Sequence, residues 1–197
     1  RSNETSKIKK GAYLLDKQHL KELRLVFTQS YWQGQEDIEE ALLEGFQPNH
    51  DLRTMQIMGY AGVKVPSWAL CENTMRSLPL LVKIQLIDLQ KLRRLPSFSQ
   101  LCSLEQLLLI DIPKLEYMES ESSYVSSAHW TFYPSLKELR LENLPKVQGW
   151  WRDGVMVNAE GDGRGRTSST REQGGGNGHE MSSLLLFPNL SRLTIKE

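Results

Sequence analysis

Residue types that could carry covalent or metal chemistry are few in this chain and lie far apart. The four histidines are His19, His50, His129 and His179. They form no His-Glu-x-x-His motif, and the two cysteines, Cys71 and Cys102, form no Cys-x-x-Cys pair, so the ligand spacing of zinc sites is missing. No Gly-x-Ser-x-Gly nucleophile elbow occurs either. We therefore find no catalytic or metal-binding constellation and predict that the chain is not an enzyme.

A glycine-rich motif, Gly161-x-Gly163-x-Gly165, partly matches a phosphate-binding loop. It follows no predicted strand and lacks the Lys-Ser/Thr pair that contacts phosphate and magnesium, so we interpret it as linker and expect no cofactor in this chain. The two cysteines are 31 positions apart and form no disulfide scaffold. That usage favours a reducing compartment and a role as small buried hydrophobic residues.

The remaining possibility is that the chain recognises a partner through a surface. The candidate residues for such a surface alternate with regularly spaced leucines. If the segments are strands lying side by side, alternate side chains form three columns on one face of a sheet. The first column is Glu22, Thr54, Lys83, Gln106, Glu138 and Arg192. The second is Arg24, Gln56, Gln85, Leu108, Arg140 and Thr194. The third is Val26, Met58, Ile87, Ile110, Glu142 and Lys196.

We predict that this face binds another protein. The predicted binding residues are Glu22, Arg24, Thr54, Gln56, Met58, Lys83, Gln85, Ile87, Gln106, Leu108, Ile110, Glu138, Arg140, Glu142 and Arg192. The third column is apolar in four successive segments, and contiguous exposed apolar surface often marks a docking site. The same side chains could instead tuck under the turn after each strand, and the sequence leaves both interpretations open.

A twelve-residue sequence motif, which occurs three times, must position these columns. It reads Leu-x-x-Leu-x-Leu-x-x-Leu-Pro-Lys-Val at 136–147, with close variants at 104–115 and 81–92, and its first half recurs from Leu20, Leu52 and Leu190. Such copies predict a leucine-rich repeat, in which no copy buries its apolar face alone and neighbours must stack. The predicted fold class is α/β: a solenoid with a curved parallel sheet on the concave face and loops and short helices on the convex face.

The repeats set the predicted domain organisation. Residues 1–157 form leucine-rich repeats with strands near 20–26, 52–58, 81–87, 104–110 and 136–142. Residues 158–183, rich in Gly and Ser, form a disordered insertion, because they bury too little apolar surface to offset their ordering entropy. Residues 184–197 form a further repeat, which we expect to be truncated because no polar capping segment follows it.

Between the first two strands, residues 36–46 are predicted to form a helix on the convex side. Ile38, Ala41 and Leu42 fall at helical spacing, and acidic residues at 36 and 37 favour a helix N-terminus. Three tryptophans flank the last repeats: Trp130, Trp150 and Trp151. They could anchor an interface, although convex-side packing is the interpretation we favour.

Composition excludes several classes of protein. Lys+Arg and Asp+Glu are both 24, and this zero formal charge argues against a nucleic-acid-binding protein, which usually carries a basic surplus. Hydrophobic residues make up 39%, enough to build a core. The longest apolar runs fall far short of the roughly 20 residues that span a bilayer, and the N-terminus shows no secretory core.

Two runs of residues carry a family resemblance. The run from Glu40 to Leu52, EALLEGFQPNHDL, leads to the run from Gly59 to Trp68, GYAGVKVPSW. Together they closely resemble a phrase of plant intracellular nucleotide-binding leucine-rich-repeat disease-resistance proteins, particularly the coiled-coil class. The segment from Tyr133 to Leu139 is similar to another phrase of that family.

The resemblance implies a cytoplasmic immune receptor. Its repeats would sense a pathogen effector, directly or through a guarded host protein, and restrain the nucleotide switch of the parent. The implied partners are therefore the effector or host protein and the parent's own nucleotide-binding domain. This chain shows no coiled-coil segment, phosphate loop or switch-domain motif, so ADP or ATP is expected on an absent domain of the parent.

Two alternatives belong to other functional classes. An extracellular leucine-rich-repeat receptor or enzyme-inhibitor module typically shows more regular repeats, a Gly-x-Ile-Pro phrase and paired cap cysteines, none of which we find here. A substrate-recruiting adaptor of a ubiquitin ligase should carry a recruiting helical box, which is also missing. Irregular repeat spacing and few cysteines favour the immune receptor, and the extracellular module remains the alternative.

Overall fold

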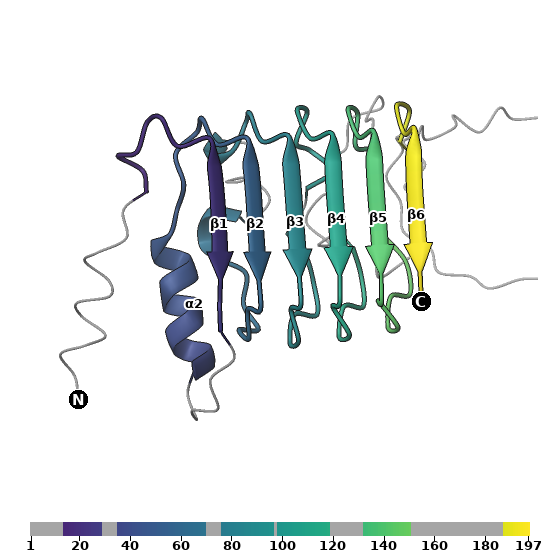
Figure 1. Ribbon diagram of the computed structural model, residues 1–197, viewed down its shortest axis with the longest axis horizontal. Helices are drawn as coiled ribbons and strands as arrows, with labels where there is room; N and C mark the ends of the chain where they lie inside the picture. The colour runs from purple at the N-terminus through teal and green to yellow at the C-terminus, as the bar shows by residue number, and fades with distance from the viewer. Residues whose placement is uncertain (1–13, 29–34, 70–75, 97, 119–131, 151–186) are drawn as a thin grey trace, which may run out of the picture.

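Parallel strands form a single sheet in the computed structural model, which describes residues 14–28, 35–69, 76–96, 98–118, 132–150 and 187–197. The strands are β1 (Glu22–Val26), β2 (Thr54–Met58), β3 (Lys83–Ile87), β4 (Gln106–Ile110), β5 (Glu138–Glu142) and β6 (Arg192–Lys196). Every neighbouring pair is parallel, and the spatial order follows the chain order (Figure 1). This topology confirms the predicted α/β leucine-rich-repeat fold.

The leucine spacing fixes the register of each strand pair. Glu22 lies opposite Thr54, and the same alignment of repeats continues through β6, where Glu138 lies opposite Arg192. Successive side chains of a strand point to opposite faces, so the leucines of each phrase turn inward and the residues between them turn outward. The three predicted columns are therefore adjacent in the sheet. We call the face that carries them the outward face.

The inward face of the sheet carries the core. A fully buried leucine precedes each of four successive strands: Leu52, Leu81, Leu104 and Leu136. Burying such a side chain stabilises the fold by roughly 1.5–3 kcal/mol, so each repeat contributes through the contacts it makes with its neighbours. On β6, in contrast, Leu193 and Ile195 are 55% and 66% exposed. That strand has a neighbour on one side alone among the described elements.

Regular turns join the strands to the rest of each repeat. Before the strands, one carbonyl accepts two successive backbone N–H groups of the next repeat; the Lys21 carbonyl, for example, accepts those of Arg53 at 2.8 Å and Thr54 at 3.0 Å. After the strands, a residue with left-handed backbone redirects the chain. These residues are Gly59, Asp88, Asp111 and Asn143, with φ between 50° and 70°. Gly, Asp and Asn adopt this conformation most readily.

The predicted helix is α2 (Gln35–Gly45), seen at the β1 end of the array in Figure 1. Of the apolar residues at helical spacing, Ala41 and Leu42 are half-buried but Ile38 is 45% exposed, whereas Glu39 and Leu43 are the buried residues of the helix. The reason is the partner of the helix: the loop after β2 offers backbone N–H groups, which carboxylates bind and aliphatic side chains cannot. That loop ends in the short 3-10 helix η1 (Ser67–Ala69).

An aromatic cluster joins the last two repeats. Phe132, Tyr133, Trp150 and Phe187 pack with ring centroids 4.7–6.1 Å apart. Trp150 thus packs against the core, as we favoured from the sequence. Trp130, Trp151, Cys71 and the predicted insertion at 158–183 lie outside the described residues. The prediction that Cys102 is buried was wrong, because its side chain is exposed. None of the helices in the described ranges is long and apolar enough to cross a membrane.

Candidate protein-binding surface

The outward face of β1–β6 brings the predicted binding residues together. Glu22, Arg24 and Arg192 are exposed, and Leu108 is 8% exposed. The half-buried members are Thr54, Gln56, Met58, Lys83, Gln85, Ile87, Gln106, Ile110, Glu138, Arg140 and Glu142. In Figure 1 no described helix or strand crosses this sheet, so the face is continuous from one end of the array to the other. Their role in binding remains a prediction.

The middle of this face carries no charge in its second and third columns. We call these six residues of β2, β3 and β4 the uncharged patch: Gln56, Met58, Gln85, Ile87, Leu108 and Ile110. Leu108 is largely covered by its neighbours, whereas Met58, Ile87 and Ile110 keep part of their surface exposed. The third column is therefore neither fully exposed nor fully tucked under the turns after the strands. Its central members are partly covered, whereas Val26 at its end is 56% exposed.

Glutamine side chains lie within the uncharged patch, at Gln56 and Gln85, and beside it, at Gln106. Among the described residues, none provides a hydrogen-bond partner for the side-chain amides of Gln56, Gln85 or Gln106. Each amide offers two N–H donors and one carbonyl acceptor. These groups are therefore available to a partner that presents backbone amides.

The end of the face over β5 and β6 is different, because its charges are paired with one another. Arg140 Nη2 lies 2.8 Å from Glu142 Oε2, and Lys196 Nζ lies 2.9 Å from Glu142 Oε1. Arg192 Nη1 lies 3.4 Å from Glu138 Oε1. The hydrogen bond from Arg140, followed by that from Lys196, lowers the pKa of Glu142 to about 2. The same contact with Glu142 raises the pKa of Arg140.

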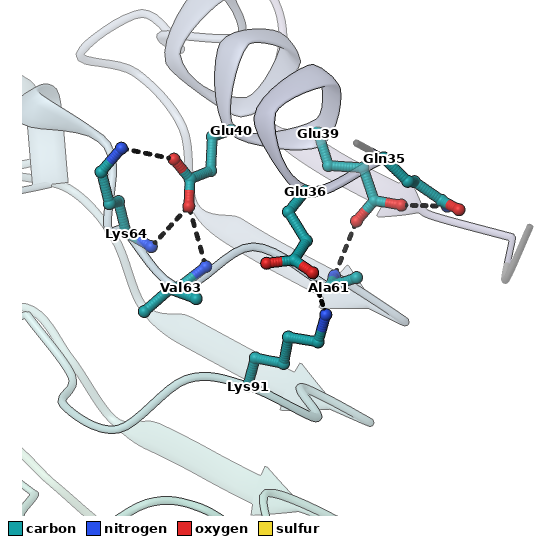
Figure 2. A network of polar contacts seen from close by, with 8 residues as sticks. All are labelled: Gln35, Glu36, Glu39, Glu40, Ala61, Val63, Lys64 and Lys91. Carbon is teal, nitrogen blue, oxygen red and sulfur yellow. Dashed lines mark hydrogen bonds and ion pairs between the residues drawn. The ribbon is translucent and has the colours of Figure 1, made fainter. Parts of the chain in front are cut away.

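Sequence reasoning missed a set of contacts between α2 and the loop after β2, shown in Figure 2. Glu40 Oε1 accepts the backbone N–H groups of Val63 at 2.9 Å and Lys64 at 3.1 Å, and its Oε2 pairs with Lys64 Nζ at 3.0 Å. Buried Glu39 accepts the N–H of Ala61 at 2.6 Å. We call Glu39, Glu40 and Glu44, with the 61–67 loop that they bind, the carboxylate clamp.

Further contacts extend the clamp along the helix. Glu44 accepts the backbone N–H of Ser67 at 2.8 Å. Figure 2 shows that Glu36 pairs with Lys91, which lies beyond β3. Burial opposes ionisation of Glu40, but the Lys64 ammonium and the two backbone amides outweigh it, so the net pKa is lowered. Burial, together with the nearby charge of Glu40, raises the pKa of Tyr60. In sequence these glutamates resemble an ordinary solvated helix face, which is why they gave no signal.

A second missed feature locks neighbouring repeats along the edge before the strands. Ser103 Oγ donates to the Pro79 carbonyl at 2.9 Å, Ser135 Oγ donates to that of Cys102 at 2.5 Å, and Asn189 Nδ2 donates to that of Pro134 at 2.6 Å. Each donor stands just before the leucine that leads into its strand. These bonds hold successive repeats in register, and hence the columns of the outward face.

The described residues also enclose a small apolar cavity beneath β2 and β3. Leu43, Ile57, Trp68, Leu86 and Phe98 contribute to its lining, and its volume is about 30 Å³. Small-molecule sites usually occupy roughly 300–1,000 Å³ and combine apolar walls with a few polar groups. The cavity is therefore too small for a typical small-molecule ligand.

Comparisons with known proteins agree with this architecture. The family model described as R13L1/DRL21 LRRs matches residues 1–112, more than half of the 197-residue chain. The chain is also similar to the disease resistance protein RGA4 of Solanum bulbocastanum, with 25% identity over 119 residues. That match covers 60% of this chain and 12% of the relative's length. No solved structure gives a significant match.

Proposed function

The chain belongs to the R13L1/DRL21 family of leucine-rich repeats, and from this premise we propose that it is the protein-interaction module of a plant immune receptor. In this role it takes part in sensing a pathogen effector, directly or through a host protein. It also restrains the nucleotide switch of the parent receptor, the larger protein to which such a module belongs. The module is non-catalytic and works by binding.

One observation carries the proposal: the strands present a continuous outward face that no described element covers (Figure 1). Repeat proteins use such extended faces to bind other proteins. The similarity to the Solanum relative, a disease resistance protein, supports plant immunity as the setting. The match to 12% of that relative's length supports a module that acts within a larger receptor.

A leaf expression assay of a receptor that carries this array tests the proposal. Arg24→Glu reverses an exposed charge on the outward face, and Lys114→Glu reverses an exposed charge in the turn after β4. At matched protein levels, we expect Arg24→Glu to change cell death, either by releasing restraint or by impairing effector response. Lys114→Glu should behave as the unaltered receptor. Equal behaviour of the two variants would contradict the proposal.

A further inference from the structure

The distribution of charge along the outward face narrows the chemistry of a partner. Across β2, β3 and β4, the uncharged patch combines half-exposed aliphatic side chains with glutamine amides to which no described residue is hydrogen-bonded. The second column becomes charged at Arg24 on β1, where the third column keeps apolar Val26, and both columns become charged at Arg140 and Glu142 on β5. An uncharged centre with a charged rim is the usual anatomy of a protein–protein contact.

The charged end of the face is less suited to be the centre of a contact. Glu142 already binds Arg140 and Lys196, and Glu138 binds Arg192. A partner that covered these pairs would remove charges from water without supplying them with new bonds, and that desolvation is costly. The uncharged patch has the opposite balance, because covering it buries apolar surface and gives partners to free amides.

We propose that the uncharged patch is the contact centre for an uncharged segment of a partner protein. That segment places an aliphatic or aromatic side chain against Met58, Ile87 and Ile110, and its peptide groups bond to the amides of Gln56 and Gln85. Adjacent strands are roughly 4.8 Å apart, so the patch spans about 10 Å across three strands, room for one or two large side chains. Methionine adapts its shape readily, which suits such a contact.

This inference rests on the proposed function, because it specifies the partner chemistry of the same face. A random-peptide phage library selected on the full chain tests it directly. We expect the enriched peptides to be richer in aliphatic and aromatic residues than the unselected library and to have net charges closer to zero. Selected peptides should then be measured for affinity as synthetic peptides.

Variants of the chain show where the selected peptides bind. Ile87→Glu places a charge in the centre of the patch and should weaken binding about tenfold or more, as expected at a binding hot spot. Gln85→Ala, which adds no charge, should weaken it in the same direction. The matched control is Ile195→Glu on β6, because Ile195 is 66% exposed and offers another apolar site. Circular dichroism melts of all three variants show whether each remains folded.

Several results would overturn the inference. One is enrichment of charged peptides that depend on Arg24 or Arg140, which would leave the outward face as a binding surface with different chemistry. Another is binding that survives Ile87→Glu in a folded variant, or the selection of no peptide that depends on Ile87. A dimer of this chain that Ile87→Glu dissociates would assign the patch to a second copy. Failure of the proposed function is distinct, since it appears in the leaf assay as indifference to Arg24→Glu.

Discussion

At the scale of single residues, backbone geometry and paired charges decide which positions tolerate change. Gly59 follows β2 with φ of 70°, and a Cβ built on it would lie 2.2 Å from the Phe27 carbonyl oxygen. The neighbouring repeats place Asp88, Asp111 and Asn143 in the same left-handed conformation. Gly59 therefore combines a backbone requirement with a close approach of the preceding repeat, which makes it the most constrained of these turns.

Gly59→Ala should lower the free energy of unfolding by about 1–3 kcal/mol, because it introduces both a strained φ and a collision with backbone. Gly45→Ala is the matched control, since a Cβ at that position meets nothing within 4 Å. Urea melts of the two variants and the unaltered chain measure the effect. Equal stability of Gly59→Ala and the unaltered chain would show that the turn relaxes without cost.

Glu142 should make the stability of the folded chain depend on pH in the acid range. Its pKa is lowered from 4.5 to about 2 in the folded chain, so its contribution to stability is present above pH 4.5 and is lost as the pH falls toward 2. The unaltered chain should thus exceed Glu142→Gln in stability at neutral pH, and the difference should shrink across that window. Urea melts at several pH values measure it, with Glu22→Gln as a control; a constant difference would contradict the ion-pair account.

At the scale of elements, α2 is held by the carboxylate clamp as much as by apolar packing. Removing Glu40 leaves two backbone N–H groups and Lys64 without their acceptor. Glu40→Ala should cost about 1–3 kcal/mol and speed hydrogen exchange at Val63 and Lys64, with little effect on β4 and β5. Asp37→Ala, an exposed carboxylate on the same helix, is the control. Exchange that rises equally in both variants would show that α2 frays as a whole.

The strands were predictable from the sequence because the regular spacing of leucines determines them. Leucines at fixed spacing set the strands, and parallel stacking of equal phrases sets the register, so the columns through Arg24, Gln85 and Arg140 followed directly. The bounds of α2 also came within one residue of the expected 36–46. The burial of Glu39 was not predictable, because it depends on the amides of a loop about 22 residues later in the chain, such as that of Ala61, which binds Glu39.

The positions of the candidate site residues were predictable from the sequence, but the contacts among their side chains were not. Nothing in the spacing indicates that Glu142 binds both Arg140 and Lys196 while no described residue bonds to the amides of Gln56 and Gln85. Such pairing depends on side-chain conformations across β5 and β6, which a pattern of leucines does not encode. The structure therefore moves the expected contact from the whole face to the uncharged patch.

At the scale of the whole molecule, the array is a set of interfaces between neighbouring repeats, so a defect in the core spreads. Leu107 is fully buried in the central strand β4. Leu107→Asp should abolish folding or cost more than about 4 kcal/mol, because an unpaired charge enters the core. Arg24→Glu, on the outward face, should melt like the unaltered chain. Similar melting of both variants would remove the distinction between the inward and outward faces.

The predicted insertion at 158–183 should be dispensable for the array. Residues on its two sides meet through the aromatic cluster, where the Trp150 and Phe187 rings lie 5.0 Å apart. Replacing 158–183 with a short Gly/Ser linker should leave the thermal melt and the β5–β6 pairing unchanged, because the rings of the cluster and the paired residues of β5 and β6 all lie outside that segment. A large drop in melting temperature would instead assign the segment to the repeat structure.

We expect this chain to meet its protein partner through the outward face. Site-specific photocrosslinking in plant cells tests this expectation, with a benzophenone amino acid in place of Gln106, on the outward face beside the uncharged patch, or of Lys114 in the turn after β4. A discrete crosslinked protein should form from position 106 and be missing from position 114. Crosslinking from position 114 alone, or equally from both positions, would contradict it.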